Sequence, residues 1–160
     1  MKRKLFLDLD GVLADFESRA KAILACEDIR RYEFVYGAED MWSKLNAVGD
    51  FFRSMEFMDG AVRLWSKVKH LNPTILTAIP KTNPESAERQ KRDWVRFKLG
   101  RDAEVITCLT KDKPNYCAPG AILVDDRAVN RKEWEAKGGI LVLHENALTT
   151  IDTLRAIGVL

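Results

Sequence analysis

Short runs of consecutive apolar residues recur along the chain, separated by longer segments with helical periodicity. Most of these runs are rich in leucine or β-branched residues, and they occupy residues 5–9, 74–77, 104–107, 121–124 and 140–143. Apolar residues at consecutive rather than alternate positions are typical of strands buried on both faces of a parallel sheet. The pattern therefore predicts a central parallel sheet of about five strands.

Helical patterns fill the segments between the later runs. One begins at Asn83, whose side chain can cap the helix ahead of a proline at the first helical position, and it continues to Leu99. Further helices are expected over residues 61–71 and 131–137 and after Thr150, which can cap the last of them. The alternation of strands and helices predicts an α/β, doubly wound, Rossmann-like domain.

The segment between the first two expected strands differs from the rest. Residues 15–60 contain no strand-like run of comparable strength but many aromatic residues, namely Phe16, Tyr32, Phe34, Tyr36, Trp42, Phe51 and Phe52. We expect a small helical cap inserted over residues 15–60, many of whose aromatic side chains pack as core. Residues 1–14 and 61–160 would then form the core domain.

Composition fits a protein of this kind. The chain has 160 residues, of which 46% are apolar and 31% are charged, as is usual for a soluble globular protein. No apolar run approaches the roughly 18 to 20 residues needed to cross a bilayer. The basic start, Met1–Lys4, resembles that of a signal peptide, but Asp8 and Asp10 interrupt the apolar stretch that follows. A cytoplasmic protein without a membrane partner is expected.

Charge and cysteine content exclude other classes. A net charge of +2 lacks the basic excess of a dedicated nucleic-acid binder, so no stable nucleic-acid partner is expected. Cys26, Cys108 and Cys117 are widely spaced and form no Cys-x-x-Cys pair, which predicts reduced thiols rather than zinc ligands or disulfides. The two histidines, His70 and His144, are expected in loops or at the surface rather than in catalysis.

The most informative motif follows the first strand. Asp8 and Asp10 are two residues apart and are followed at once by Gly11. Ligands of open α/β sheets bind at the carboxyl ends of the strands, and paired carboxylates there favour a hard divalent cation such as Mg²⁺. A calcium-binding EF-hand also begins with Asp-x-Asp, but it requires glycine and glutamate where this chain has Leu13 and Arg19. The EF-hand is therefore rejected.

Further polar residues follow later strands. Asp125 and Asp126 come directly after one buried run, Thr77 ends another, and a lysine-containing loop with Lys111 and Lys113 precedes the acidic pair. Together with the first motif they would form one site that holds several carboxylates, a hydroxyl group and an ammonium group. Such a site suits phosphoryl transfer, in which a carboxylate attacks phosphorus, a second acid moves the proton, and cations stabilise the phosphoryl oxygens.

These four motifs, in order from Asp8 to Asp126, resemble those of the haloacid dehalogenase-like (HAD) phosphohydrolase superfamily. The resemblance covers nearly the whole chain. It implies that Asp8 is the nucleophile and a ligand of Mg²⁺. It also implies that Asp10 is the acid/base and binds Mg²⁺ through its backbone carbonyl, and the presence of this residue favours phosphate rather than haloacid chemistry.

The same resemblance assigns the later motifs. Thr77 would bind the phosphoryl group, and Lys113 would neutralise it, with Lys111 as the alternative. Asp125, Asp126 or both would complete the metal shell.

A narrower resemblance is to the 5'(3')-deoxyribonucleotidases, and it rests on residues 8–16, 51–52, 59–61, 94–95, 99–100, 109–113 and 123–127. It implies that Phe16 contacts the base, that Lys81 helps to hold phosphate, that Arg127 lies at the site, and that a homodimer is possible. The family's Thr-Ser-Pro stretch is Thr-Ala-Ile-Pro here, so the backbone N–H of Ala78 remains but a serine hydroxyl is lost. Trp42 is a weaker candidate for stacking on a base.

The sequence thus predicts a Mg²⁺-dependent phosphomonoesterase that acts on nucleoside monophosphates through an aspartyl-phosphate. Two alternatives remain open. The same chemistry could serve sugar phosphates or nucleic-acid ends, or the protein could bind a ligand without turnover.

Overall fold

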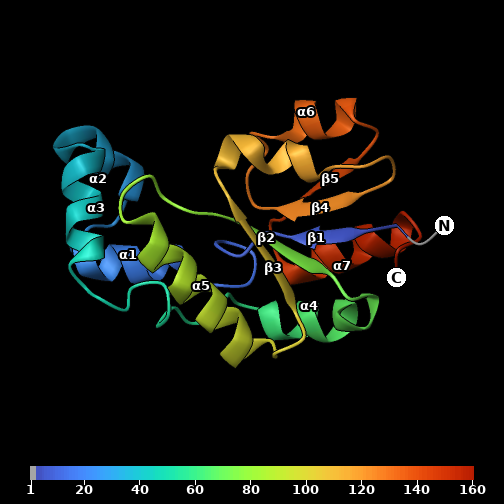
Figure 1. The fold of residues 1–160 in the computed structure, drawn as a ribbon, viewed down its shortest axis with the longest axis horizontal. Coiled ribbons are helices and arrows are strands. Elements are labelled where there is room, and N and C mark those ends of the chain that lie inside the picture. The colour runs from blue at the N-terminus through green and yellow to red at the C-terminus, as the bar shows by residue number, and fades with distance from the viewer. Residues whose placement is uncertain (1–2) are drawn as a thin grey trace.

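The computed structural model describes residues 3–160, so the first two residues of the basic N-terminal run lie outside it. Five parallel strands form one sheet in the order β3-β2-β1-β4-β5, as predicted (Figure 1). The strands are β1 (Leu5–Leu7), β2 (Thr74–Ala78), β3 (Glu104–Cys108), β4 (Ile122–Asp125) and β5 (Ile140–Leu143). The first strand therefore lies at the centre, between β2 and β4, where both faces are covered.

Two buried cores cover the two faces of the sheet. Successive side chains of a strand point to opposite faces, and β1 sends Leu5 and Leu7 into one core and Phe6 into the other. Figure 1 shows α6 (Arg131–Ala136) on one side of the sheet, and α4 (Ala61–Val68) and α7 (Ala147–Ala156) on the other. On the α6 side, Phe6 meets Trp134 edge to face with 5.5 Å between the ring centroids.

The starts of two helices differ from the sequence prediction. Helix α7 begins after Asn146, whose side chain accepts a hydrogen bond from the backbone N–H of Thr149. Thr150, the expected cap, is instead buried, and its hydroxyl lies 2.7 Å from Nδ1 of His144. Helix α5 (Pro84–Lys98) begins with proline as expected, but Asn83 has a left-handed backbone (φ 50°) and its side chain caps nothing.

Three short helices follow β1 in the segment expected to be a cap: α1 (Phe16–Leu24), α2 (Ile29–Tyr36) and α3 (Ala38–Asn46). They stand beside the sheet at the end where the strands stop (Figure 1). Their buried side chains belong to the same apolar cluster as the core under the sheet, namely Ala20, Leu24, Tyr32, Met41 and Leu45. Phe34 and Tyr36, by contrast, are exposed.

Within residues 3–160, none of the helices combines the length and the apolar character needed to cross a bilayer. The three cysteines are free thiols. Residues 69–71, expected to continue α4, form a separate 3-10 turn.

Candidate active site

The register of the two central strands places the first catalytic candidates side by side. Leu7 of β1 pairs with Val124 of β4, so the next residues of the two strands, Asp8 and Asp125, are neighbours at the carboxyl ends. The backbone N–H of Asp8 continues this ladder by donating to the carbonyl of Val124 at 2.8 Å. Both aspartates line a cavity of about 1240 Å³ between the sheet and the cap helices. The sheet topology thus brings two separate motifs to one point.

Lys113 lies between these two carboxylates. Its Nζ is 3.0 Å from Oδ1 of Asp8 and 2.8 Å from Oδ2 of Asp125, and all three residues are buried. Burial alone would lower the pKa of Lys113, but the charges of the two aspartates outweigh it and raise the pKa above its usual range. Lys111, the alternative, is exposed and does not line the cavity.

Asp126 completes a cluster of three carboxylates. One oxygen each from Asp8, Asp125 and Asp126 lies within 4.8 Å of the others. Burial, and then the neighbouring acids, outweigh the attraction of Lys113 and raise the pKa of Asp8 to about 8. Partial removal of its carboxyl from water, and then the charge of Asp125, raises the pKa of Asp126 to about 6. Three carboxylates share a single ammonium group, that of Lys113, so the ionised cluster carries an excess of negative charge.

Gly11 makes room for the cluster. It has φ 81°, a left-handed conformation that side chains disfavour, and a Cβ atom there would lie 2.2 Å from Oδ2 of Asp126. The glycine in the first motif thus lets the loop after β1 pack directly against the carboxyl group of Asp126.

Asp10 faces the cavity and is held by a residue that the sequence analysis missed. The ammonium group of Lys91, on α5, lies 2.7 Å from Oδ2 of Asp10, 3.2 Å from Oγ1 of Thr77 and 2.5 Å from the carbonyl oxygen of Ala78. Lys91 is 1% exposed. The signal was its place on the inward face of the helical pattern, three residues before the buried Trp94.

The expected phosphate-binding residues of β2 divide into two groups. Ala78 lines the cavity, and the buried hydroxyl of Thr77 lies beneath it, in contact with Lys91. Lys81, in contrast, is exposed in the loop after β2 and does not line the cavity.

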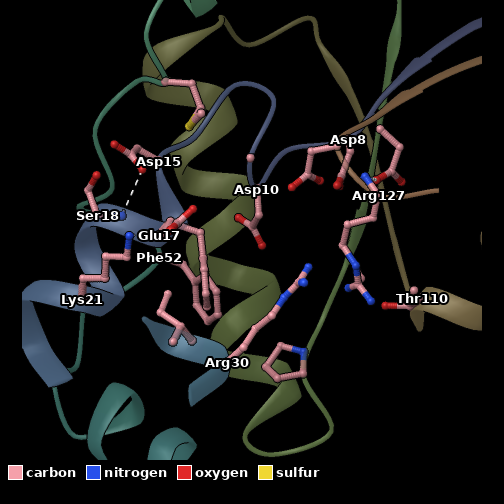
Figure 2. Close-up of a pocket in the computed structure, with 18 of the residues that line it drawn as sticks. Asp8, Asp10, Asp15, Glu17, Ser18, Lys21, Arg30, Phe52, Thr110 and Arg127 are labelled. Atoms are coloured by element: carbon pink, nitrogen blue, oxygen red, sulfur yellow. Dashed lines mark hydrogen bonds and ion pairs between the residues drawn. The ribbon is translucent and has the colours of Figure 1, made fainter. Parts of the chain in front are cut away.

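Two arginines reach into the cavity from opposite walls. Arg127 follows the acidic pair; its backbone N–H donates to Oδ1 of Asp125 at 2.9 Å, and its side chain extends toward the cavity (Figure 2). Arg30 of α2, which the sequence analysis did not single out, points toward the same space from the cap side (Figure 2). Among residues 3–160, neither guanidinium group forms a salt bridge with a carboxylate.

Aromatic side chains form the cap-side wall. Phe16 lines the cavity and packs against Trp42 and Phe52, with ring centroids 6.1 Å and 6.4 Å away. Trp42 and Phe52 also line the cavity.

His144 lies in the loop after β5, as expected, but is buried rather than at the surface, and burial lowers its pKa.

The arrangement defines a class of protein. A parallel α/β sheet with the order β3-β2-β1-β4-β5, a nucleophile candidate after β1, and a lysine and paired acids beside it are the features of a HAD phosphohydrolase. The chain belongs to the family described as 5' nucleotidase, deoxy (pyrimidine), cytosolic type C protein, which it matches over residues 2–158.

Solved structures share the fold at low sequence identity. A hydrolase from Streptococcus pneumoniae TIGR4 superimposes with a TM-score of 0.63 at 14% identity, over 97% of this chain and 100% of that one. A HAD-superfamily hydrolase from Ehrlichia chaffeensis gives a TM-score of 0.54 at 12% identity, over 98% of each chain. No curated protein matches the chain.

Proposed function

We propose that the protein is a Mg²⁺-dependent phosphomonoesterase that hydrolyses nucleoside monophosphates, deoxynucleotides among them, through an aspartyl-phosphate. The observation that carries this proposal is the position of Asp8, whose buried carboxylate lies beside the buried Lys113 and Asp125 and close to the exposed Asp126. The cavity above that point has an aromatic wall. The first feature suits phosphoryl transfer and the second suits a base.

The three-aspartate cluster fits a divalent metal ion. Its donors are all carboxylate oxygens, which Mg²⁺ prefers, and the one ammonium group beside them, that of Lys113, leaves an excess of negative charge when all three are ionised. Asp8, Asp125, Asp126 and the backbone carbonyl of Asp10 would hold the ion. When bound, Mg²⁺ supplies charge that neutralises the phosphoryl oxygens and the carboxylates around them.

In the first chemical step, a carboxylate oxygen of Asp8 attacks phosphorus and the bond from phosphorus to the ester oxygen breaks. Asp10 gives its proton to that leaving oxygen. Lys113, the hydroxyl of Thr77 and the backbone N–H of Ala78 stabilise the charge on the phosphoryl oxygens.

In the second step, water attacks the phosphorus of the aspartyl-phosphate and releases inorganic phosphate. Asp10, now ionised, takes a proton from that water, and the carboxylate of Asp8 is regenerated. Asp10 thus serves first as acid and then as base, and its protonation state is the same after the reaction as before it.

The walls of the cavity favour a nucleotide over a polynucleotide. Phe16, Trp42 and Phe52 offer aromatic surface to a base, and Arg127 offers a charge to the anionic part of the substrate. The cap-side rim also carries several acidic residues, including Glu17, Glu27, Asp28 and Glu33. Such a rim repels an extended phosphate backbone. We infer that residues 15–60 act as a substrate-binding cap.

Phosphate release tests the proposal. Purified protein is incubated with 5'- and 3'-nucleotides, sugar phosphates and an end-phosphorylated oligonucleotide, with and without Mg²⁺. Mg²⁺-dependent release from nucleotides, abolished in Asp8→Asn, is the expected result. The matched control is Asp93→Asn, which replaces an aspartate outside the cavity that pairs with Arg53.

The panel also separates the alternatives. Release from sugar phosphates or the oligonucleotide alone would keep the chemistry and reject the nucleotide. No release from any substrate would overturn the enzymatic proposal and favour a binding protein.

A further inference from the structure

Lys91 occupies an unusual position for a lysine. Its side chain comes from the middle of α5 and its ammonium group is buried beneath the cavity, 4.8 Å from the ring centroid of Phe52. Burying an ammonium group costs several kcal/mol unless partners compensate. The compensation here comes from one full charge, the carboxylate of Asp10, together with the oxygens of Thr77 and Ala78.

The contact divides the two oxygens of Asp10. Oδ2 is held by Lys91 at 2.7 Å, whereas Oδ1 is buried and has no hydrogen-bond partner among residues 3–160. A buried, unpaired carboxylate oxygen is costly and is uncommon in native proteins. The contact with Lys91 therefore fixes how the carboxylate turns: Oδ1 points away from solvent, and the exposed part of the Asp10 side chain lies at the cavity, where a proton-transferring group must be.

We propose that Lys91 is a positioning residue for the reaction: by binding Oδ2 of Asp10 it holds this carboxylate at the cavity wall in the orientation that proton transfer requires. This inference rests on the proposed function, in which Asp10 transfers the proton. It goes further by naming the side chain that orients Asp10. Asp10 lies in the loop after β1, so an anchor on α5 fixes a residue that the sheet itself does not hold.

The same helix already holds the neighbouring segment in place. Oε1 of Gln90 accepts the backbone N–H of Phe52, and the indole N–H of Trp94 donates to the carbonyl of Met55 at 2.7 Å. These contacts hold α5 in place without involving Asp8 or Asp10. A variant that loses only the contact of Lys91 with Asp10 should therefore keep α5 folded.

The test compares two leaving groups in the Lys91→Met variant. Methionine keeps the length and apolar stem of lysine and removes the ammonium group. A nucleotide leaves as an alkoxide and needs a proton, whereas 4-nitrophenyl phosphate leaves as a weakly basic phenolate and does not. We expect kcat with Mg²⁺ to fall about a hundredfold on the best nucleotide and less than about fivefold on 4-nitrophenyl phosphate.

Lys98→Met is the matched control. Lys98 lies on the same helix with its ammonium group 5.3 Å from the ring centroid of Phe57, but it is exposed and contacts no group of the site. Both of its rates should equal those of the wild type. Should Lys91→Met not fold, as judged by circular dichroism, Lys91→Gln provides the same comparison with a neutral polar side chain.

A crystal structure of the variant gives a readout that does not depend on activity. We expect the carboxylate of Asp10 to turn away from its wild-type orientation or to occupy two. Equal losses on both substrates, no loss on either, or an unmoved Asp10 would overturn this inference alone. A wild-type protein inactive on both substrates would overturn the proposed function, and the role of Lys91 with it.

Discussion

Burying a lysine costs free energy unless a carboxylate compensates its charge. The site contains two buried lysines whose charge is compensated in this way. Lys113 is shared by Asp8 and Asp125, while Lys91 belongs to Asp10. The first lysine lies in the loop before the acidic pair, and the sequence predicts it with Lys111 as the alternative. The second is harder to predict: its place three residues before Trp94 puts it on the inward face of α5, but a lysine within a charged helix is usually solvated, and its partner lies 81 positions away in the chain. Its burial depends on the packing of α5 against the loop after β1.

A substitution at Gly11 tests the closest packing of the site. A methyl group there would overlap Oδ2 of Asp126. The residue that carries it would also have to adopt a left-handed backbone conformation with φ 81°. In Gly11→Ala we expect phosphatase activity to fall at least about a hundredfold, because the third carboxylate is displaced. Gly37→Ala isolates the backbone effect, since Gly37 has φ 89° with no atom within 4 Å of the added Cβ.

Both variants should lose about 1–3 kcal/mol of unfolding free energy from backbone strain, and only Gly11→Ala should lose activity. Equal activity in the two variants would contradict the close packing at Gly11.

At the scale of elements, the sheet and the helices of the core could be predicted because each has a simple pattern of apolar residues. Strands buried on both faces appear as continuous apolar runs, and the amphipathic face of α4 appears at helical spacing. The bounds of α1–α3 could not be predicted, because their buried residues are few and complete a core built mainly by other elements. Helix α2 illustrates this: of its eight residues only Tyr32 is buried.

Helix α2 nevertheless contributes a charge to the cavity through Arg30. Its guanidinium group points into the space above the aspartates, so it can donate to the anionic part of a substrate (Figure 2). In Arg30→Gln we expect KM for the nucleotide to rise up to about tenfold with kcat nearly unchanged, since a charge-assisted hydrogen bond contributes about 1.5 kcal/mol.

Arg31→Gln is the control for this prediction, because Arg31 is exposed on the same helix and does not line the cavity. Steady-state kinetics on both variants decide the question. A tenfold loss of kcat at constant KM in Arg30→Gln would place Arg30 in the chemical step instead of in binding.

At the scale of the whole molecule, the crowded carboxylates lower stability when no metal is bound. The pKa of Asp8 is raised from 3.8 to about 8, chiefly by burial, so between these values the folded protein binds more protons than the unfolded chain. Stability therefore falls as pH rises through this range, and the pKa of about 6 at Asp126 acts in the same direction. Near pH 8, proton loss leaves the repulsion uncompensated unless a cation enters.

Thermal unfolding with a chelator measures the cost of ionising Asp8, to which burial contributes most and the neighbouring acids contribute less. Relative to Asp8→Asn, which has no proton to lose at this position, the wild type should show a Tm that declines from pH 5 to pH 8. Because Mg²⁺ competes with protons for the same oxygens, its addition should raise the wild-type Tm more at pH 8 than at pH 5. The same Tm difference between the two proteins at both pH values would show that Asp8 is already ionised in the folded, metal-free protein. Lys113 would then compensate its charge in full.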